Sequence, residues 1–84
     1  MKKINLHLGC GKRYLPRYIH IDIDEYPHID YNHDIKTLPM FSDKSVDLIY
    51  TCGTFEYFDR YEAINILKEW SRVLKPRGIL RISV

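Results

Sequence analysis

The C-terminal half of the chain limits the fold most strongly, because a strand pattern, a helix pattern and a second strand pattern follow one another there. Residues 46–51 read Val-Asp-Leu-Ile-Tyr-Thr, which is rich in residues that favour β-strands. Apolar side chains recur at helical spacing over residues 60–74, and residues 79–84 return to a strand pattern. A strand–helix–strand unit of this kind is a crossover connection, so we expect its two strands to be parallel.

The predicted helix carries a start signal and a stop signal. Asp59 is a good N-cap residue, and Glu62 stands three positions later, which is the spacing of a capping box. Pro76 and Gly78 are expected to end the helix. Trp70 lies on the apolar stripe of this helix, so we expect it in the hydrophobic core and not on a binding surface.

Three shorter strands are predicted in the N-terminal half: residues 4–8, which end at Gly9, residues 18–23, and residues 29–33, which end at Asp34. The predicted order of elements is therefore four strands, a helix and a fifth strand. This order favours an α/β fold with a Rossmann-like, mostly parallel sheet.

The connection between the first two strands is short for a parallel pair. Only about nine residues, Gly9 to Arg17, separate them, whereas a parallel crossover usually needs a dozen or more. We therefore expect the crossover helix here to be missing or reduced to a turn. One clear helix cannot cover both faces of a five-stranded sheet, so either a partner covers the rest or the chain is part of something longer.

Length and composition limit the chain to one small globular domain. It has 84 residues, 45% hydrophobic and 29% charged, with a net charge of +2. Both signs of charge are spread along the chain without a basic block, so we expect no nucleic-acid partner. A signal-peptide pattern and an apolar run near the ~18 residues of a membrane span are both lacking. We therefore expect no membrane association and a cytoplasmic protein, in which Cys10 and Cys52 stay reduced.

Several short motifs occur in a fixed order along the chain. They are Leu-Gly-Cys-Gly at 8–11, Ile-His-Ile-Asp at 19–22, Leu-Pro-Met-Phe at 38–41, Ser-Val-Asp-Leu-Ile-Tyr at 45–50 and Arg-Val-Leu-Lys-Pro-Arg-Gly-Ile-Leu at 72–80. This set resembles the N-terminal half of class I S-adenosylmethionine-dependent methyltransferases, and it is most similar to a small type 11-like subgroup. The resemblance covers nearly the whole chain and implies a partial methyltransferase domain, truncated after the fifth strand.

The resemblance also implies where S-adenosylmethionine binds. In open α/β sheets, ligands lie beyond the carboxyl ends of the strands, and glycines there let backbone N–H groups approach a ligand closely. In the family, the glycine loop meets the methionine end of the cofactor, and the acid after the third strand receives the adenine amino group. The corresponding cofactor-binding positions here are Gly9, Cys10, Gly11, Asp22, Ile23, Asp34, Ile35 and Thr51.

Two acids compete for the ribose of the cofactor. A carboxylate at the end of the second strand can accept hydrogen bonds from both ribose hydroxyls. The alignment of Ile-His-Ile-Asp with the family pattern favours Asp22, but Asp24 is close enough to take this role. Asp34 has an alternative as an Asx-turn residue.

No catalytic residue can be assigned from the sequence. Methyl transfer from a sulfonium is an in-line displacement, in which the enzyme mainly positions the reactants. Glu56 and Tyr57 stand where the family has Glu-His, so a His-dependent proton transfer is in doubt. Both residues are candidates to hold the acceptor or the end of the cofactor. The four histidines lack a repeated paired-ligand spacing, so we expect no metal site.

Two alternatives remain open. An NAD- or nucleotide-sugar-binding fragment is disfavoured, because the third glycine is absent and because the acid follows the glycines too soon. Arg13 stands at the end of the methyltransferase family's GxGxG pattern, which is a departure from that family, and Tyr14 stands at the end of the dinucleotide-binding GxGxxG pattern. A non-catalytic Rossmann-like module that binds a nucleotide or serves oligomerisation is the second. In the family the last strand lies inside the sheet, and here residues 79–84 would form an open edge. We therefore expect a homo-oligomer, most simply a two-fold dimer through this edge strand or the bare sheet face.

Overall fold

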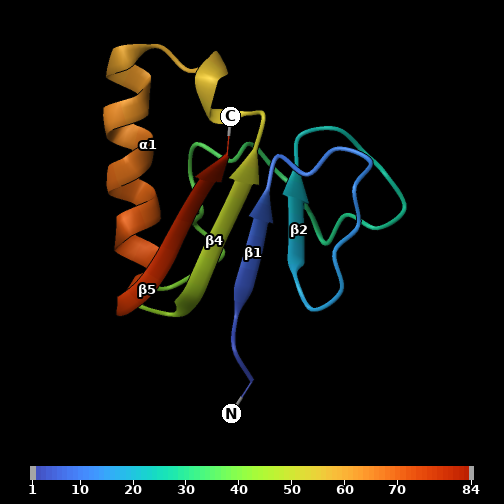
Figure 1. Ribbon diagram of the computed structural model, residues 1–84, viewed down its shortest axis with the longest axis horizontal. Coiled ribbons are helices and arrows are strands. Elements are labelled where there is room, and N and C mark those ends of the chain that lie inside the picture. Colours follow the sequence, from blue (N-terminus) through green and yellow to red (C-terminus); the bar gives the residue numbers. More distant parts are fainter. Residues whose placement is uncertain (1, 84) are drawn as a thin grey trace.

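Five parallel strands form one sheet in the order β3-β2-β1-β4-β5 (Figure 1). The computed structural model describes residues 2–83, and the strands are β1 (Asn5–Leu8), β2 (Ile19–Asp22), β3 (Tyr31–Asn32), β4 (Val46–Cys52) and β5 (Leu74–Ser83). Every neighbouring pair is parallel, which confirms the predicted α/β, Rossmann-like fold. The chain leaves β1 toward one edge of the sheet and later continues from β4 toward the other. The strand order therefore reverses between β1 and β4, which is where such sheets bind ligands.

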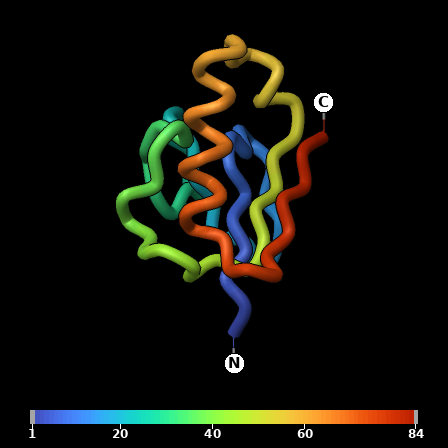
Figure 2. Tube along the Cα trace, turned by 90° about the vertical axis from the view of Figure 1, so that its left-hand side faces the viewer, coloured from blue at the N-terminus to red at the C-terminus, as the bar shows by residue number. Residues whose placement is uncertain are grey.

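The one α-helix found in residues 2–83, α1 (Arg60–Val73), has the capping box that the sequence predicts. The Asp59 carboxylate accepts the Glu62 N–H at 2.8 Å, and the Glu62 carboxylate accepts the Asp59 N–H at 3.3 Å. A short 3₁₀ helix, η1 (Phe55–Tyr57), joins β4 to α1. Figure 2 shows α1 lying against one face of the sheet.

The last strand begins earlier than predicted, because the chain turns from helix to extended backbone without a loop. Leu74 caps α1 at φ −73° and ψ 138°, and it already pairs with Val46. Regular pairing resumes only at Ile79, opposite Leu48. The segment between them contains Pro76, which lacks an N–H for the ladder. The predicted boundary at residue 79 therefore marks the start of regular pairing and not of the strand.

The core lies between the sheet and α1. Leu6, Ile21 and Ile49 on the sheet are fully buried, as is Trp70 on the helix. The Trp70 indole N–H donates to the Ile35 carbonyl at 2.9 Å, so this large side chain is buried without an unpaired donor. Burial of one such side chain contributes about 1.5–3 kcal/mol. The prediction that Trp70 belongs to the core is confirmed.

Hydrogen bonds join the segment that begins at Leu38 to the C-terminal part of α1. The Glu69 carboxylate accepts the Leu38 N–H at 2.7 Å, and the Arg72 guanidinium donates to the Leu38 carbonyl at 2.9 Å. Arg72 also pairs with Glu69 and with Asp43. The Arg72 guanidinium, followed by the Leu38 N–H, lowers the pKa of Glu69 to about 2. This network fixes the loop that follows β3 against α1.

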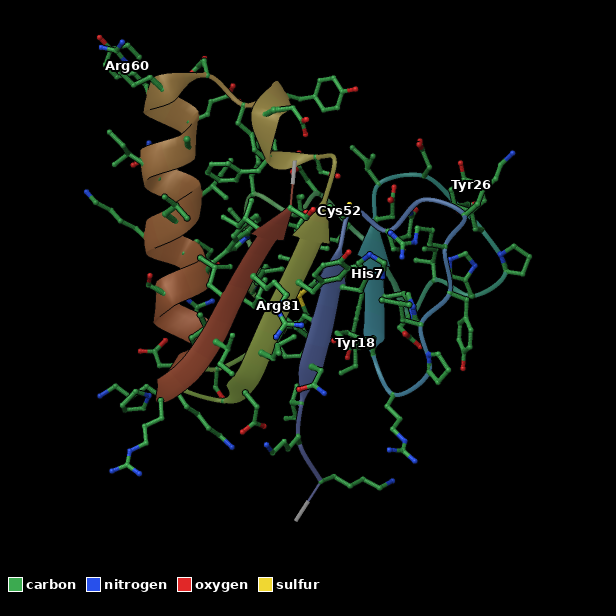
Figure 3. The ribbon with its side chains drawn as sticks, viewed as in Figure 1. His7, Tyr18, Tyr26, Cys52, Arg60 and Arg81 are labelled. Atoms are coloured by element: carbon green, nitrogen blue, oxygen red, sulfur yellow. The ribbon has the colours of Figure 1, made fainter. Side chains whose placement is uncertain are left out.

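The other face of the sheet has no helix within residues 2–83 and is partly covered by the loop between β1 and β2 (Figure 3). The Tyr14 ring stacks on His20 with ring centroids 5.1 Å apart, and the Tyr18 ring meets His7 edge-on at 6.1 Å. The Leu15 N–H donates to His20 Nε2 at 3.0 Å. The crossover between these parallel strands is thus a loop packed by aromatic rings, as the short connection predicts.

Candidate functional site

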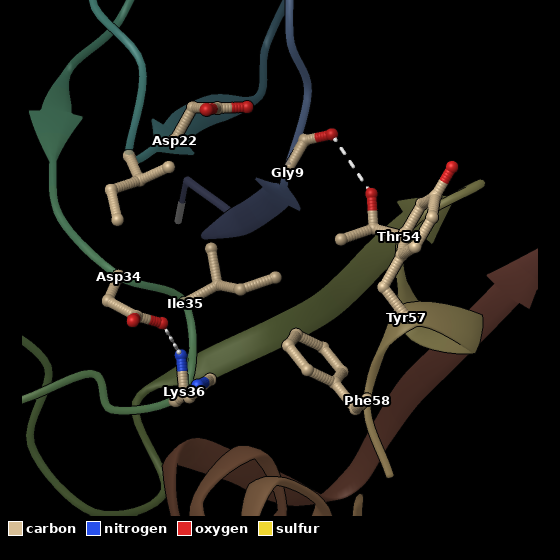
Figure 4. A pocket seen from close by; sticks show the side chains of 9 residues that line it. Gly9, Asp22, Asp34, Ile35, Lys36, Thr54, Tyr57 and Phe58 are labelled. Carbon is tan, nitrogen blue, oxygen red and sulfur yellow. Dashed lines mark hydrogen bonds between the residues drawn. The ribbon is translucent and has the colours of Figure 1, made fainter.

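A cavity of about 290 Å³ opens where the strand order reverses, at the carboxyl ends of β1, β2 and β4 (Figure 4). Its walls come from four segments of the chain: the glycine loop, the end of β2, the loop after β3 and the segment that contains η1. The lining residues are Gly9, Asp22, Ile23, Asp34, Ile35, Lys36, Thr54, Tyr57 and Phe58.

The glycine loop fits tightly against the segment after β4. Gly9 has φ 65°, a conformation that other residues rarely adopt, and a Cβ there would lie 2.7 Å from the Thr54 hydroxyl oxygen. The Thr54 hydroxyl donates to the Gly9 carbonyl at 3.3 Å. The absence of a side chain at Gly9 is therefore required by the close approach of two loops at the cavity.

Asp22 is the buried acid of the cavity. The residue is only 7% exposed, and its two carboxylate oxygens accept the Gly11 N–H at 2.7 Å and the Asp24 N–H at 2.8 Å. These bonds fix the carboxylate relative to the glycine loop. Each carboxylate oxygen has a further lone pair for another donor. Asp24 contributes its backbone to this arrangement, but its exposed side chain does not line the cavity.

The loop after β3 forms the opposite wall. The Asp34 carboxylate accepts the Lys36 N–H at 2.9 Å, which is the Asx-type turn that the sequence leaves open as an alternative. Ile35 is buried, and its carbonyl is held by Trp70. The Lys36 ammonium pairs with the Glu62 carboxylate at 2.8 Å. The wall is thus tied to α1 at two points, once inside the core and once at the surface.

Some predicted site residues lie beside the cavity and do not line it. Cys10 is buried next to His28, and burial raises the pKa of its thiol to about 11. Thr51 is fully buried on β4, and its hydroxyl has no partner among residues 2–83. Gly11 contributes through its N–H to Asp22. Of the two candidates after β4, Tyr57 lines the cavity and is largely exposed, whereas Glu56 does not line it.

Sequence reasoning missed three lining residues: Lys36, Thr54 and Phe58. Lys36 directly follows the predicted site residues Asp34 and Ile35, so its place beside the cavity could have been predicted from them. Thr54 and Phe58 flank the predicted Glu56 and Tyr57, but their position depends on the turn at Gly53 and on η1. No pattern in the sequence indicates that Thr54 would meet Gly9.

The cavity combines two acids with apolar surface. Asp22 and Asp34 can accept hydrogen bonds from hydroxyl or amino groups, and the Ile35 side chain and the Phe58 ring offer apolar contacts. Such a site suits a ligand that carries hydroxyl groups and an aromatic ring. Within residues 2–83, no cluster of three or more His, Cys, Asp or Glu side chains is arranged to hold a metal ion. None of the helices described is both long and apolar enough to cross a membrane.

Comparison with known proteins identifies the family. A family model described as a methyltransferase domain matches residues 6–82, which span all five strands and α1. The search of curated proteins found no match. The matched segment contains the glycine loop, the acid at the end of β2 and the strand–helix–strand unit. By its sequence and its fold, the chain belongs to the class I S-adenosylmethionine-dependent methyltransferases, type 11-like.

Proposed function

We propose that the cavity at the end of β1, β2 and β4 binds S-adenosylmethionine, and that residues 1–84 act as the cofactor-binding part of a methyltransferase domain. One observation carries the proposal. The buried carboxylate of Asp22 is fixed by the Gly11 N–H at the rim of a cavity, at the point where the strand order reverses. A buried carboxylate with unused lone pairs is costly unless a ligand or water satisfies it.

The residues present suit the cofactor. Asp22 would accept hydrogen bonds from the ribose hydroxyls, and the glycine loop, which leaves no room for a Cβ at Gly9, would meet the methionine end. Ile35 and Phe58 would contact the adenine ring, and the Asp34 carboxylate would accept a hydrogen bond from the adenine amino group. The Asx turn uses one oxygen of Asp34 for the Lys36 N–H and leaves the other free for this role.

The bound cofactor would supply an electrophilic methyl group. The chain's own contribution is position and exclusion of water: Thr54 and Gly9 hold the loop, and Tyr57 stands at the exposed rim of the cavity. Tyr57 and Glu56 lie on η1, directly after β4, where an acceptor would approach. No residue is assigned as a general base.

The proposal is tested by calorimetric titration with S-adenosylhomocysteine. Asp22→Ala should weaken binding by ~1–3 kcal/mol, because charge-assisted hydrogen bonds are lost. Asp24→Ala is the matched control, since it removes an acid two residues further along the chain whose side chain does not line the cavity. Fluorescence of the buried Trp70 verifies that each variant is folded. Equal affinities of the two variants would contradict the ribose role of Asp22.

We also propose that the chain self-associates through β5, as the sequence suggests. Within residues 2–83, β5 pairs only with β4, so its other edge has no strand beside it. Ile79 and Ile82 on this strand are 51% and 37% exposed. An apolar edge strand is a template for pairing with another chain. A cytoplasmic location also stays a prediction.

A further inference from the structure

A second depression lies on the sheet face opposite α1. It is lined by Arg13, Leu15, Tyr18, Tyr50, Arg81 and Ser83, and we name it the arginine pocket. On β5, Arg81 lies opposite Tyr50 of β4, and Ser83 lies opposite Cys52 of β4. Alternation along the strands therefore places these four side chains on one face. The arginine pocket shares no lining residue with the cofactor cavity.

Charge is unbalanced around this pocket. Among residues 2–83, neither Arg13 nor Arg81 has a carboxylate within ion-pair distance, whereas Arg72 and Lys75 each have one. All acidic residues of the chain stand at position 22 or later. The first 21 residues, which include the loop over this face, carry five basic side chains and no acid: Lys2, Lys3, Lys12, Arg13 and Arg17.

Aromatic rings and backbone bonds make the pocket rigid. Tyr18 and Tyr50 meet edge to face with ring centroids 6.3 Å apart, and each also contacts the buried ring of His7. The Leu15 N–H is bound by His20, and the Ser83 carbonyl accepts the Gly53 N–H at 2.8 Å. Arg13, on the loop between β1 and β2, and Arg81, on β5, therefore line the pocket together with packed aromatic rings.

Two neighbouring side chains respond to the charge of Arg13. Hydrogen bonds from Ser83 and Tyr50, followed by the Arg13 charge, lower the pKa of the Cys52 thiol. Burial first, and then the charges of His20 and Arg13, lower the pKa of His7 to about 4. In both cases the charge of Arg13 adds to larger causes, in the direction expected near a cation.

We propose that the arginine pocket binds an anionic group of the phosphate or diphosphate type, with Arg13 and Arg81 as its principal ligands. Guanidinium groups match phosphate oxygens in a bidentate manner. Two guanidinium charges balance a phosphate monoester, which carries about −1.5 to −2 charges near pH 7. The phosphate can belong to a free anion, a phosphosugar or a nucleotide.

The first experiment is a calorimetric titration of the full chain with inorganic pyrophosphate. Arg13→Gln and Arg81→Gln should each weaken binding at least about tenfold, because each removes charge-assisted hydrogen bonds. Arg77→Gln is the matched control, since Arg77 is an exposed arginine on β5 that does not line the pocket. An equal loss in all three variants would show only non-specific attraction and would overturn the proposal. Parallel titrations with inorganic phosphate, a hexose phosphate and a nucleoside diphosphate show which phosphate compound binds most tightly.

The second experiment uses Cys52 as a reporter in a Cys10→Ser background, which leaves one thiol. The ratio of the reaction rate with anionic iodoacetate to the rate with neutral iodoacetamide should be higher for Cys52 than for free cysteine. Pyrophosphate should slow the reactions of Cys52 with both reagents. Arg13→Gln should remove this preference, because the Arg13 charge acts on the Cys52 thiol, and it should leave the affinity for S-adenosylhomocysteine unchanged, so the result is independent of the cofactor site. A reagent preference equal to that of free cysteine, without protection by pyrophosphate, would overturn the proposal.

Discussion

Acidification should destabilise this domain in part through His7, a buried side chain on β1. His7 is 1% exposed, and its Nδ1 has no hydrogen-bond partner among residues 2–83. Burial, then the nearby charges of His20, Arg13 and His28, lower its pKa from 6.5 to about 4, against a smaller opposite effect of Asp22. The folded chain therefore keeps His7 neutral over a pH range in which the unfolded chain protonates it.

The sign and size of the effect follow from linkage. Because the pKa of His7 is lower in the folded state, its cost to folding is absent above the unfolded pKa of 6.5 and grows as the pH falls toward 4. One pKa unit corresponds to about 1.4 kcal/mol, so the loss is about 2 kcal/mol near pH 5 and about 3 kcal/mol near pH 4. Small domains have only about 5–15 kcal/mol of stability in total, so this loss is large.

The assay is urea unfolding at several pH values between about 7 and about 4, followed by fluorescence of Trp70, the only tryptophan. His7→Phe keeps a ring between Tyr18 and Tyr50 but cannot take up a proton. Between neutral pH and about pH 5, the free energy of unfolding of this variant should fall by about 2 kcal/mol less than that of the wild-type chain. His33→Gln is the control, because His33 is not among the rings that contact His7, and it should keep the wild-type pH dependence. If His7→Phe kept the wild-type pH dependence, protonation of His7 would not be a cause of the acid destabilisation.

Three further predictions concern the backbone, the cavity and the edge strand. Arg17 has φ 71°, so Arg17→Gly should stabilise the domain by about 1 kcal/mol in urea unfolding; Lys12→Gly, at a position without positive φ, should not. Gly9→Ala should weaken S-adenosylhomocysteine binding and lower stability by about 1–3 kcal/mol, because the new Cβ meets the Thr54 side chain, and adding Thr54→Ala should recover part of the loss. Ile82→Lys should shift a dimer toward monomer in sedimentation velocity; a wild-type chain that sediments as a folded monomer at micromolar concentration would contradict the dimer.

Much of the fold was predictable because its signals are local. The capping box at Asp59 and Glu62, the apolar stripe that includes Trp70, and the short link from Gly9 to Arg17 each fix their own element. The start of β5 at Leu74 was not predictable, because Pro76 and Gly78 read as breakers and the extended backbone before them depends on pairing with β4.

The candidate site was predictable only at the strand ends. Gly9, Asp22 and Asp34 follow strands, and parallel strands bring their carboxyl ends to one edge. Contacts between loops leave no local pattern, so the approach of Thr54 to Gly9 appeared only in the folded chain. The arginine pocket was missed for the same reason, since it joins side chains from a loop and two strands that lie far apart in sequence.

The most direct test of the cofactor-binding claim is an amide chemical-shift titration of the isotope-labelled chain with S-adenosylhomocysteine. We expect amide shifts at the cavity that saturate with ligand concentration, with the largest changes at Gly11, Ile23, Ile35 and Thr54, and little change at Arg81 on the opposite face. No saturable shift, or shifts centred on the face that carries Arg81, would contradict the assignment of this cavity as the cofactor site.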